Sequence, residues 1–204
     1  MDMSAKFWDR MAEGYSKSPI ADEEAYQKKL QITQGYFKAD MDVLEFGCGT
    51  GSTAIIHAPF VRHYHAIDIS PKMIEIAQNK ADAQNIQNIT FEASSMDELK
   101  AADQSYDAVL GLSILHLLKN REEVISQVYD SLKPGGVFVS STVCIGDTKM
   151  KYLMPFLLIG RLFGLVLKAL TAEGLEKSLR NAGFKIDYKW CPNNAGVIFL
   201  VAKK

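Results

Sequence analysis

The stretch that decides the fold is Val43-Leu44-Glu45-Phe46-Gly47-Cys48-Gly49-Thr50-Gly51. It starts as a short apolar strand, and a helical pattern begins directly after its last glycine, at Ser52. Glycines at such a turn let the chain bend tightly and let a ligand touch bare backbone, while the next helix offers unpaired N–H groups. Because ligands bind beyond the carboxyl ends of the strands in open α/β sheets, this loop is predicted to bind one.

Residues around the loop indicate which ligand it takes. A dinucleotide site follows the pattern G-x-G-x-x-G, but Ser52 stands at the position of the third glycine. Glu45 would repel a phosphate and can engage an ammonium group. Asp68 follows the next apolar run, at the spacing of about 20 residues expected for a ribose-binding acid; capping of the next helix is the alternative, but Ser70 is better placed for that. The pattern favours a positively charged nucleoside over a nicotinamide dinucleotide.

Outside the loop, short β-rich runs alternate with helical patterns, which predicts one domain with a parallel sheet and helices on both faces. The predicted strands are residues 43–46, 64–67, 89–91, 106–110, 137–141, 184–190 and 197–202. The predicted helices are residues 6–13, 23–37, 52–58, a helix that starts at 70, 121–132 with a closing turn at 133–136, and 171–182. The short polar segment 191–196 between the last two strands implies an antiparallel hairpin.

Composition limits the partners and the compartment. The formal net charge is −1, which does not suggest the basic surface that binds nucleic acid, so no nucleic-acid partner is expected. The cysteines Cys48, Cys144 and Cys191 are odd in number and lack C-x-x-C spacing, so we expect no zinc site and no other metal. This cysteine usage, and a start without the pattern of a secretory signal, predict a cytoplasmic protein.

An apolar segment follows the fifth predicted strand, at residues 149–170. Pro155, Arg161 and Lys168 interrupt it, so it does not read as a transmembrane helix. We expect a helical cap over the substrate side of the ligand cleft. Ordinary packing over the sheet, a dimer contact and contact with a membrane surface are the alternatives. The oligomeric state, monomer or homodimer, stays open.

Several motifs in order resemble those of class I S-adenosylmethionine (SAM)-dependent methyltransferases. They are Glu45 to Gly51, Asp68, Tyr106-Asp107-Ala108-Val109 and Leu132-Lys133-Pro134-Gly135-Gly136. The resemblance runs from about Met41 to the C-terminus and is closest to the small bacterial group labelled methyltransferase type 11 or methyltransferase domain 25. Phe7-Trp8-Asp9-Arg10-Met11-Ala12-Glu13-Gly14-Tyr15 resembles the N-terminal helix of that group.

The resemblance implies a Rossmann-like three-layer sandwich, with a seven-stranded, mostly parallel sheet and an antiparallel C-terminal strand. Residues 1–204 then form a single domain, with an N-terminal helical arm at 1–40 and the apolar cap as an insertion. The implied reaction is methyl transfer from SAM to a small-molecule acceptor, with S-adenosylhomocysteine (SAH) as the product. The apolar cap points to an apolar or aromatic acceptor. A lipid or quinone-like ring, and SAM binding without catalysis, are the alternatives.

The resemblance also implies roles for single residues. The glycine loop holds the methionine part of SAM, and Asp68 holds the ribose. Met73 lies near the adenine, although a core position is equally open. Serine stands where many relatives have an adenine-binding aspartate, so Ser94 or Ser95 is expected to hydrogen-bond there instead. The full predicted cofactor set is Tyr15, Glu45, Gly47, Cys48, Gly49, Gly51, Asp68, Ile69, Met73, Ser94, Ser95, Met96 and Ser113.

Two side chains keep alternative readings. His116 is the candidate base or acceptor contact, because histidine titrates near neutrality, but it can also simply pack under the cofactor. Tyr15 is expected either to fold over the cofactor and reach its carboxylate or to pack within the arm. His57, His63 and His65 are predicted to be surface or strand residues.

Overall fold

The computed structural model describes residues 3–99, 103–147, 170–192 and 196–204. The predicted cap at 149–170 lies outside the described residues, apart from Leu170. The division into an arm and a cap stays a prediction.

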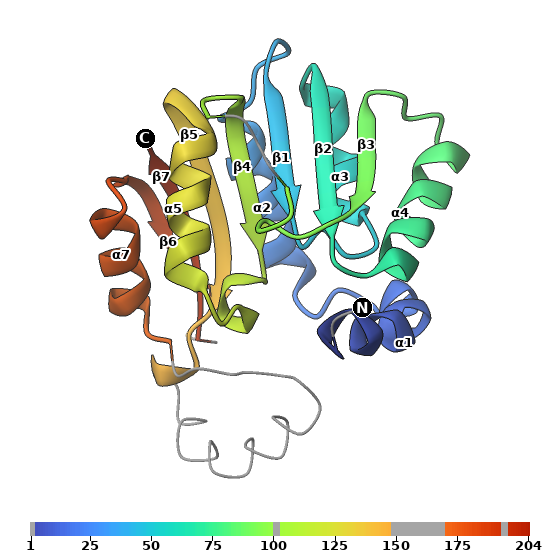
Figure 1. Ribbon diagram of the computed structural model, residues 1–204, viewed down its shortest axis with the longest axis horizontal. Coiled ribbons are helices and arrows are strands. Elements are labelled where there is room, and N and C mark those ends of the chain that lie inside the picture. Colours follow the sequence, from blue (N-terminus) through green and yellow to red (C-terminus); the bar gives the residue numbers. More distant parts are fainter. Residues whose placement is uncertain (1–2, 100–102, 148–169, 193–195) are drawn as a thin grey trace.

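The core of the molecule is a seven-stranded sheet in the order β3-β2-β1-β4-β5-β7-β6 (Figure 1). The strands are β1 (Asp42–Phe46), β2 (His63–Asp68), β3 (Ile89–Ala93), β4 (Tyr106–Leu112), β5 (Leu132–Val143), β6 (Lys185–Trp190) and β7 (Val197–Lys203). Strands β1 to β5 pair in parallel, and β7 is antiparallel to both β5 and β6. The predicted Rossmann-like sheet with one reversed C-terminal strand is confirmed.

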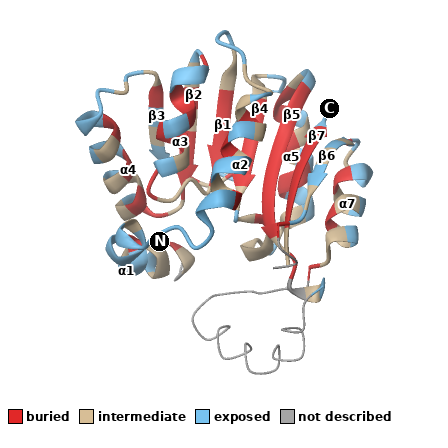
Figure 2. Ribbon diagram, turned by 180° about the vertical axis from the view of Figure 1, so that it is seen from behind, coloured by how far each residue is buried: buried red, intermediate tan, exposed pale blue. Residues whose placement is uncertain are grey.

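Helices cover both faces of this sheet (Figures 1 and 2). They are α1 (Met3–Lys17), α2 (Glu23–Gln34), α3 (Ser52–His57), α4 (Pro71–Ala83), α5 (Arg121–Ser131) and α7 (Ala172–Asn181). Figure 1 shows α5 and α7 on one face and α2 and α3 on the other, with α1 next to α4 at the carboxyl edge of the sheet. The carboxyl edge is where a doubly covered parallel sheet binds ligands.

Alternation along the strands divides the core between the two faces. In β1, Leu44 packs into the cluster that includes α5 and α7, whereas Val43 packs into the cluster that includes α3. Successive side chains of a strand point to opposite faces, and both faces of a parallel sheet are covered. The central strands are therefore buried throughout, as Figure 2 shows.

Side-chain caps start two of the helices as predicted. The Ser70 hydroxyl accepts a hydrogen bond from the N–H of Met73 at the start of α4. The Thr171 hydroxyl accepts one from the N–H of Gly174 at the start of α7. Each cap satisfies a backbone donor that has no partner within the helix, and such a cap contributes about 1 kcal/mol.

The fifth strand starts earlier than predicted. The turn expected at 133–136 belongs to β5, and α5 ends at Ser131. Leu132 pairs with Tyr106 and Val137 with Ala108, so β5 carries a bulge opposite β4. Gly135 has φ +77° within that bulge. A Pro-Gly-Gly sequence looks like a plain turn, and only the pairing with β4 reveals the bulged strand.

Two further predictions were wrong. Helix α2 ends at Gln34 rather than Phe37, because the N–H of Tyr36 bonds to Thr33 and that of Phe37 to Gln34, in tighter turns. His57, predicted as a surface or strand residue, is fully buried in α3. Its ring lies against those of Phe37 and Tyr64, and burial lowers its pKa to about 4, so the neutral imidazole packs as an aromatic ring.

Candidate functional site

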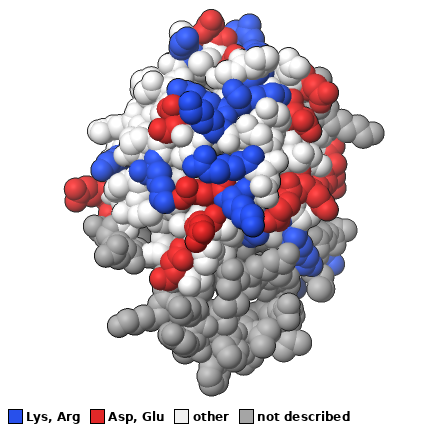
Figure 3. Space-filling model, turned by 90° about the vertical axis from the view of Figure 1, so that its left-hand side faces the viewer, with Lys and Arg blue, Asp and Glu red and all other residues white. Residues whose placement is uncertain are grey.

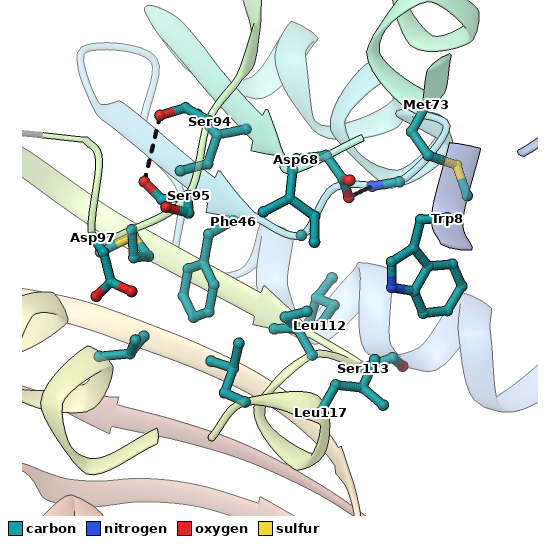
Figure 4. Close-up of a pocket in the computed structure, with 18 of the residues that line it drawn as sticks. Trp8, Phe46, Asp68, Met73, Ser94, Ser95, Asp97, Leu112, Ser113 and Leu117 are labelled. Carbon is teal, nitrogen blue, oxygen red and sulfur yellow. Dashed lines mark hydrogen bonds between the residues drawn. The ribbon is translucent and has the colours of Figure 1, made fainter. Parts of the chain in front are cut away.

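A cleft opens at the carboxyl edge of the sheet, between α1, the ends of β1 to β4 and the start of α5 (Figure 4). It encloses about 840 Å³, including space open to solvent. The lining is mainly apolar, with a few polar groups from the ends of the strands.

The glycine loop forms part of the cleft wall. Gly47, Gly49 and Gly51 have φ values of +68°, +55° and +72°, which L side chains rarely adopt. A Cβ atom on Gly47 would lie 2.8 Å from Cγ1 of Ile114. Gly47 and Gly49 line the cleft, so their bare backbone faces a ligand.

Gly51 has a different role, because it does not line the cleft. A Cβ atom there would lie 2.6 Å from Cβ of Ala77 in α4 and 2.9 Å from the ring of Phe91 in β3. The missing side chain lets α3, α4 and β3 pack closely. The conformation of the loop is therefore fixed by packing behind it as well as by its own φ values.

Gly51→Ala is expected to destabilise the protein more than Gly135→Ala. Both glycines have left-handed φ values, +72° and +77°, but no atom would lie within 4 Å of a Cβ on Gly135. Gly135→Ala should cost about 1–2 kcal/mol for the backbone alone, and Gly51→Ala about 1–3 kcal/mol more for overpacking. Urea denaturation of both variants measures the difference, and equal losses would contradict the packing role.

Asp68 joins the end of β2 to the glycine loop. Its Oδ2 accepts a hydrogen bond from the N–H of Gly49 at 2.9 Å, and its Oδ1 accepts one from the N–H of Ser70 at 2.9 Å. Each carboxylate oxygen retains a further lone pair. Burial raises the pKa of Asp68, and the bonds from Ser70 and Gly49 oppose that rise. The carboxylate is thus held rigidly at the cleft wall, with acceptor capacity left for a ligand.

Glu45 lies in the core next to the loop and does not line the cleft. The hydroxyl of Tyr64 donates a hydrogen bond to its Oε2 at 2.8 Å. Burial raises the pKa of Glu45 to about 7, although the bond from Tyr64 lowers it. Its predicted contact with a ligand ammonium group stays a prediction.

The serines after β3 line the cleft, but Ser95 is engaged in its own turn. Its hydroxyl donates to Oε2 of Glu98 and accepts from the N–H of Glu98, both at 3.2 Å. The hydroxyl of Ser94 donates a long bond of 3.4 Å to the carbonyl of Ser95, drawn in Figure 4. Met96 is buried beside them and lines the cleft.

Asp97 also lines the cleft, although it is absent from the residues that the sequence predicts. The side-chain amide of Asn120 donates to both of its carboxylate oxygens at 3.0 Å. Its position just beyond the end of a strand is the sequence feature that could have predicted Asp97 as a residue of the cleft. Its partner comes from the start of α5, and that pairing could not be read from sequence.

Ser113 lines the cleft at the end of β4 and has φ +58°. A non-glycine residue in this region costs about 1–3 kcal/mol, and such residues cluster at ligand sites. Its N–H donates to the carbonyl of Ser141 at 2.6 Å, which fixes the turn against β5.

His116 does not line the cleft. It lies in a short 3₁₀ helix, Leu115–Leu117, that follows Ser113 and Ile114. Its Nδ1 is buried and has no hydrogen-bond partner among the described residues. Burial lowers the pKa of His116, so its imidazole is neutral near pH 7.

The N-terminal helix α1 forms the remaining side of the cleft. Trp8 and Tyr15 line it, and the ring of Tyr15 would be the nearest neighbour of a Cβ on Gly49, at 3.7 Å. Asp9 fixes α1 to the start of α4, because its Oδ1 accepts from the hydroxyl of Ser70 at 2.6 Å and from the N–H of Lys72 at 3.1 Å.

Most of the predicted cofactor set meets at this cleft. The predicted residues that line it are Tyr15, Gly47, Gly49, Asp68, Ile69, Met73, Ser94, Ser95, Met96 and Ser113. Those that do not are Glu45, Cys48, Gly51 and the candidate base His116. Cys48 turns back on its own loop, with its thiol 3.7 Å from the carbonyl of Gly49. The lining also includes Trp8, Phe46 and Asp97, which the sequence does not predict.

The charged side chains that line the cleft indicate which ligands it favours. The ionisable acids among its described lining residues are Asp68 and Asp97, and no lysine, arginine or histidine belongs to that lining. A bound pyrophosphate would find no positive side chain there, whereas a ligand with positive charge would be attracted. The geometry thus favours a cationic nucleoside, as the loop sequence predicts.

Elsewhere the described residues add few features. The view onto the β6–β7 edge shows Lys and Arg side chains mixed with Asp and Glu (Figure 3). In this region Lys189 pairs with Glu176 and Lys203 with Asp187.

Within the parts of the chain that the structure describes, there is no group of three or more His, Cys, Asp or Glu suited to a metal ion. Nor does any helix there have the length and apolar character to cross a membrane.

A family model described as a methyltransferase domain matches residues 37–192. Demethylmenaquinone methyltransferase from Tropheryma whipplei is 29% identical over 154 residues, which cover 74% of this chain and 62% of that protein. The chain therefore spans about three fifths of the length of this relative.

Solved structures share the fold at low sequence identity. A chain from the complex between the Haloferax volcanii Trm112 methyltransferase activator and the putative methyltransferase matches with a TM-score of 0.77 at 15% identity, covering 96% of each chain. An S-adenosylmethionine-dependent methyltransferase from Mesorhizobium loti matches with a TM-score of 0.71 at 20% identity, covering 87% of this chain and 96% of that one.

Proposed function

Because the chain belongs to the methyltransferase domain family, we propose that it transfers a methyl group from SAM to a small apolar or aromatic acceptor. The observation that carries the proposal is the cleft itself. A glycine loop with left-handed φ values meets a rigidly held Asp68, and no cationic side chain belongs to the described lining. This combination suits a nucleoside that carries positive charge.

The residues present fit SAM part by part. Gly47 and Gly49 would leave room for the methionine part against bare backbone. The unused lone pairs of Asp68 would accept hydrogen bonds from the two ribose hydroxyls. Ile69, Met73 and Met96 would supply an apolar site for the adenine.

Bound SAM would supply a methyl group activated by the positively charged sulfur. The protein's own contribution is position, because good alignment alone can be worth roughly 7–11 kcal/mol of the barrier. The apolar walls would exclude water from the reacting groups. No nucleophilic side chain is required for such a transfer. His116 does not line the cleft, so its predicted role as a base stays a prediction.

A quinone-like ring is the second candidate within the acceptor class. The relative from Tropheryma whipplei is named a demethylmenaquinone methyltransferase, and the cleft is lined mainly by apolar side chains. Both observations favour a ring system over a sugar or a phosphate.

The protein is expected to bind SAM and SAH but not NAD. Isothermal calorimetry on the folded protein measures all three ligands. Methyl transfer is then sought as SAH production across a panel of phenols, quinols, amines and fatty acids. Binding of NAD in preference to SAH would contradict the proposal, and SAH binding without turnover of any acceptor would favour a binding module.

A further inference from the structure

Helix α1 has three distinct faces. Ala5 and Ala12 are almost fully buried, and Asp9 between them bonds to the start of α4, so this face docks the helix. A second face is charged and exposed. Its members are Lys6, Arg10, Glu13 and Lys17.

The third face is an apolar stripe of Trp8, Met11 and Tyr15. Spacings of three and four residues place these side chains on one side of the helix. Trp8 and Tyr15 line the cleft, while Met11 and Tyr15 are 48% and 54% exposed. The hydrogen bonds that hold α1 to the start of α4 come from Asp9, which lies outside the stripe. Exposed apolar side chains beside a cleft indicate a binding surface.

The adjoining wall of the cleft is apolar as well. Leu112, Ile114 and Leu117 line it, from the end of β4 and the following 3₁₀ helix. In Figure 4, Trp8 enters from α1, and Leu112, Ser113 and Leu117 occupy the neighbouring wall. A ligand between these walls would contact aromatic and aliphatic side chains on both sides.

The carboxylates of the cleft already have partners. Asp68 accepts from two backbone N–H groups, and Asp97 accepts twice from the amide of Asn120. These hydrogen bonds leave the negative charge of both carboxylates in place, and an anionic acceptor would find no positive side chain in the described lining. Bound SAM would place its positively charged sulfur beside the acceptor, which disfavours a second cation there. The electrostatics therefore favour an uncharged acceptor.

We propose that the α1 stripe of Trp8, Met11 and Tyr15 binds the methyl acceptor, and that this acceptor is a flat, uncharged aromatic ring of the quinol or phenol class. The inference rests on the proposed function, because it places the acceptor beside the SAM site. Flat rings stack on tryptophan and tyrosine in offset or edge-to-face geometry, and a stripe on a helix docked by Asp9 offers them a fixed platform.

The test uses 2,3-dimethyl-1,4-naphthoquinone as the probe, because its blocked ring positions cannot add to the cysteine thiols. The chain has two tryptophans, Trp8 and Trp190, and quinones quench tryptophan fluorescence at short range. SAH-loaded protein should show saturable quenching. Trp190→Phe, on strand β6, should keep the saturable quenching, and Trp8→Phe should lose most of it.

Trp8→Ala should raise the dissociation constant of the probe about tenfold or more, measured by equilibrium dialysis. Arg10→Ala, on the charged face of the same helix, is the matched control and should leave the constant unchanged. Met11→Lys introduces a charge into the stripe without removing the indole, and should weaken the probe as well. Circular dichroism and SAH affinity, measured on each variant, verify folding and the cofactor site.

Two results separate the possible failures. If wild-type protein does not bind SAH, the proposed function fails. If SAH binds normally but Trp8→Ala leaves probe binding unchanged, the acceptor inference alone is overturned. Saturable binding of choline in place of the naphthoquinone would overturn it in favour of a cationic acceptor.

Discussion

Asp68→Ala is expected to weaken SAH binding by about one to two orders of magnitude. The carboxylate is proposed to accept hydrogen bonds from the ribose hydroxyls, and loss of a charged hydrogen-bond partner costs about 1.5–3 kcal/mol, where 1.4 kcal/mol is a factor of ten. The substitution also leaves the N–H groups of Gly49 and Ser70 without their acceptor. Calorimetry with SAH measures the effect on the folded variant.

Two controls separate the ribose contact from charge and from loop geometry. Asp97→Asn removes a carboxylate from the same cleft while keeping its shape, and it should cost less than Asp68→Ala. An SAH analogue without ribose hydroxyls should bind wild-type protein and Asp68→Ala with nearly equal affinity. If Asp68→Ala weakens SAH and this analogue equally, the carboxylate acts only on the loop, and the ribose assignment is wrong.

Local patterns allowed most of the fold to be predicted. The glycine loop, Asp68 and the caps Ser70 and Thr171 follow from residue types at fixed short spacings, and all lie where expected. The order of apolar runs predicted a mostly parallel sheet with a C-terminal hairpin, and the family resemblance supplied its Rossmann-like layout. Local reasoning failed at the start of β5, where the bulge depends on pairing with β4.

The parts of the site that could not be predicted depend on contacts between distant segments. Trp8 reaches the cleft because Asp9, next to it in the chain, bonds to Ser70. Asp97 is held there by Asn120 from the start of α5. His57 is buried by rings from two other elements, which no spacing within α3 reveals. Long-range docking of this kind leaves little trace in a local sequence pattern.

Glu45→Gln is expected to change how stability depends on pH. Burial raises the pKa of Glu45 from 4.5 to about 7 in the folded protein. The folded state therefore binds a proton more tightly than the unfolded state. Stability from this group is fully present below about pH 4.5 and is lost as the pH rises to about 7. The difference between the folded and unfolded pKa values, 7 − 4.5, corresponds to a loss of about 3 kcal/mol in the free energy of unfolding.

The measurement is urea denaturation of wild-type protein and Glu45→Gln across pH 4–8. Glutamine keeps an acceptor for the hydroxyl of Tyr64 but cannot ionise. The free energy of unfolding of the variant, relative to that of wild type, should therefore rise by about 3 kcal/mol from the acid end of the series to pH 8. Other titrating groups, including His57, contribute equally to both proteins and cancel. Parallel pH profiles would show that Glu45 does not titrate in this range. Tyr64→Phe removes the hydrogen bond that lowers the pKa of Glu45, so the loss of stability should extend to higher pH and become larger.

The same titration tests the ligand role of Glu45. If the ammonium group of SAH lies near this carboxylate, it stabilises the ionised form, and bound SAH should remove much of the loss in stability above pH 7. Wild-type protein should then bind SAH more tightly as the pH rises from 6 to 8, where the ligand ammonium stays charged. Glu45→Gln should show no such rise. If wild-type protein and Glu45→Gln gain the same affinity for SAH as the pH rises, the proton released on SAH binding does not come from Glu45. Glu45 then serves only to hold Tyr64 in the core beside the loop.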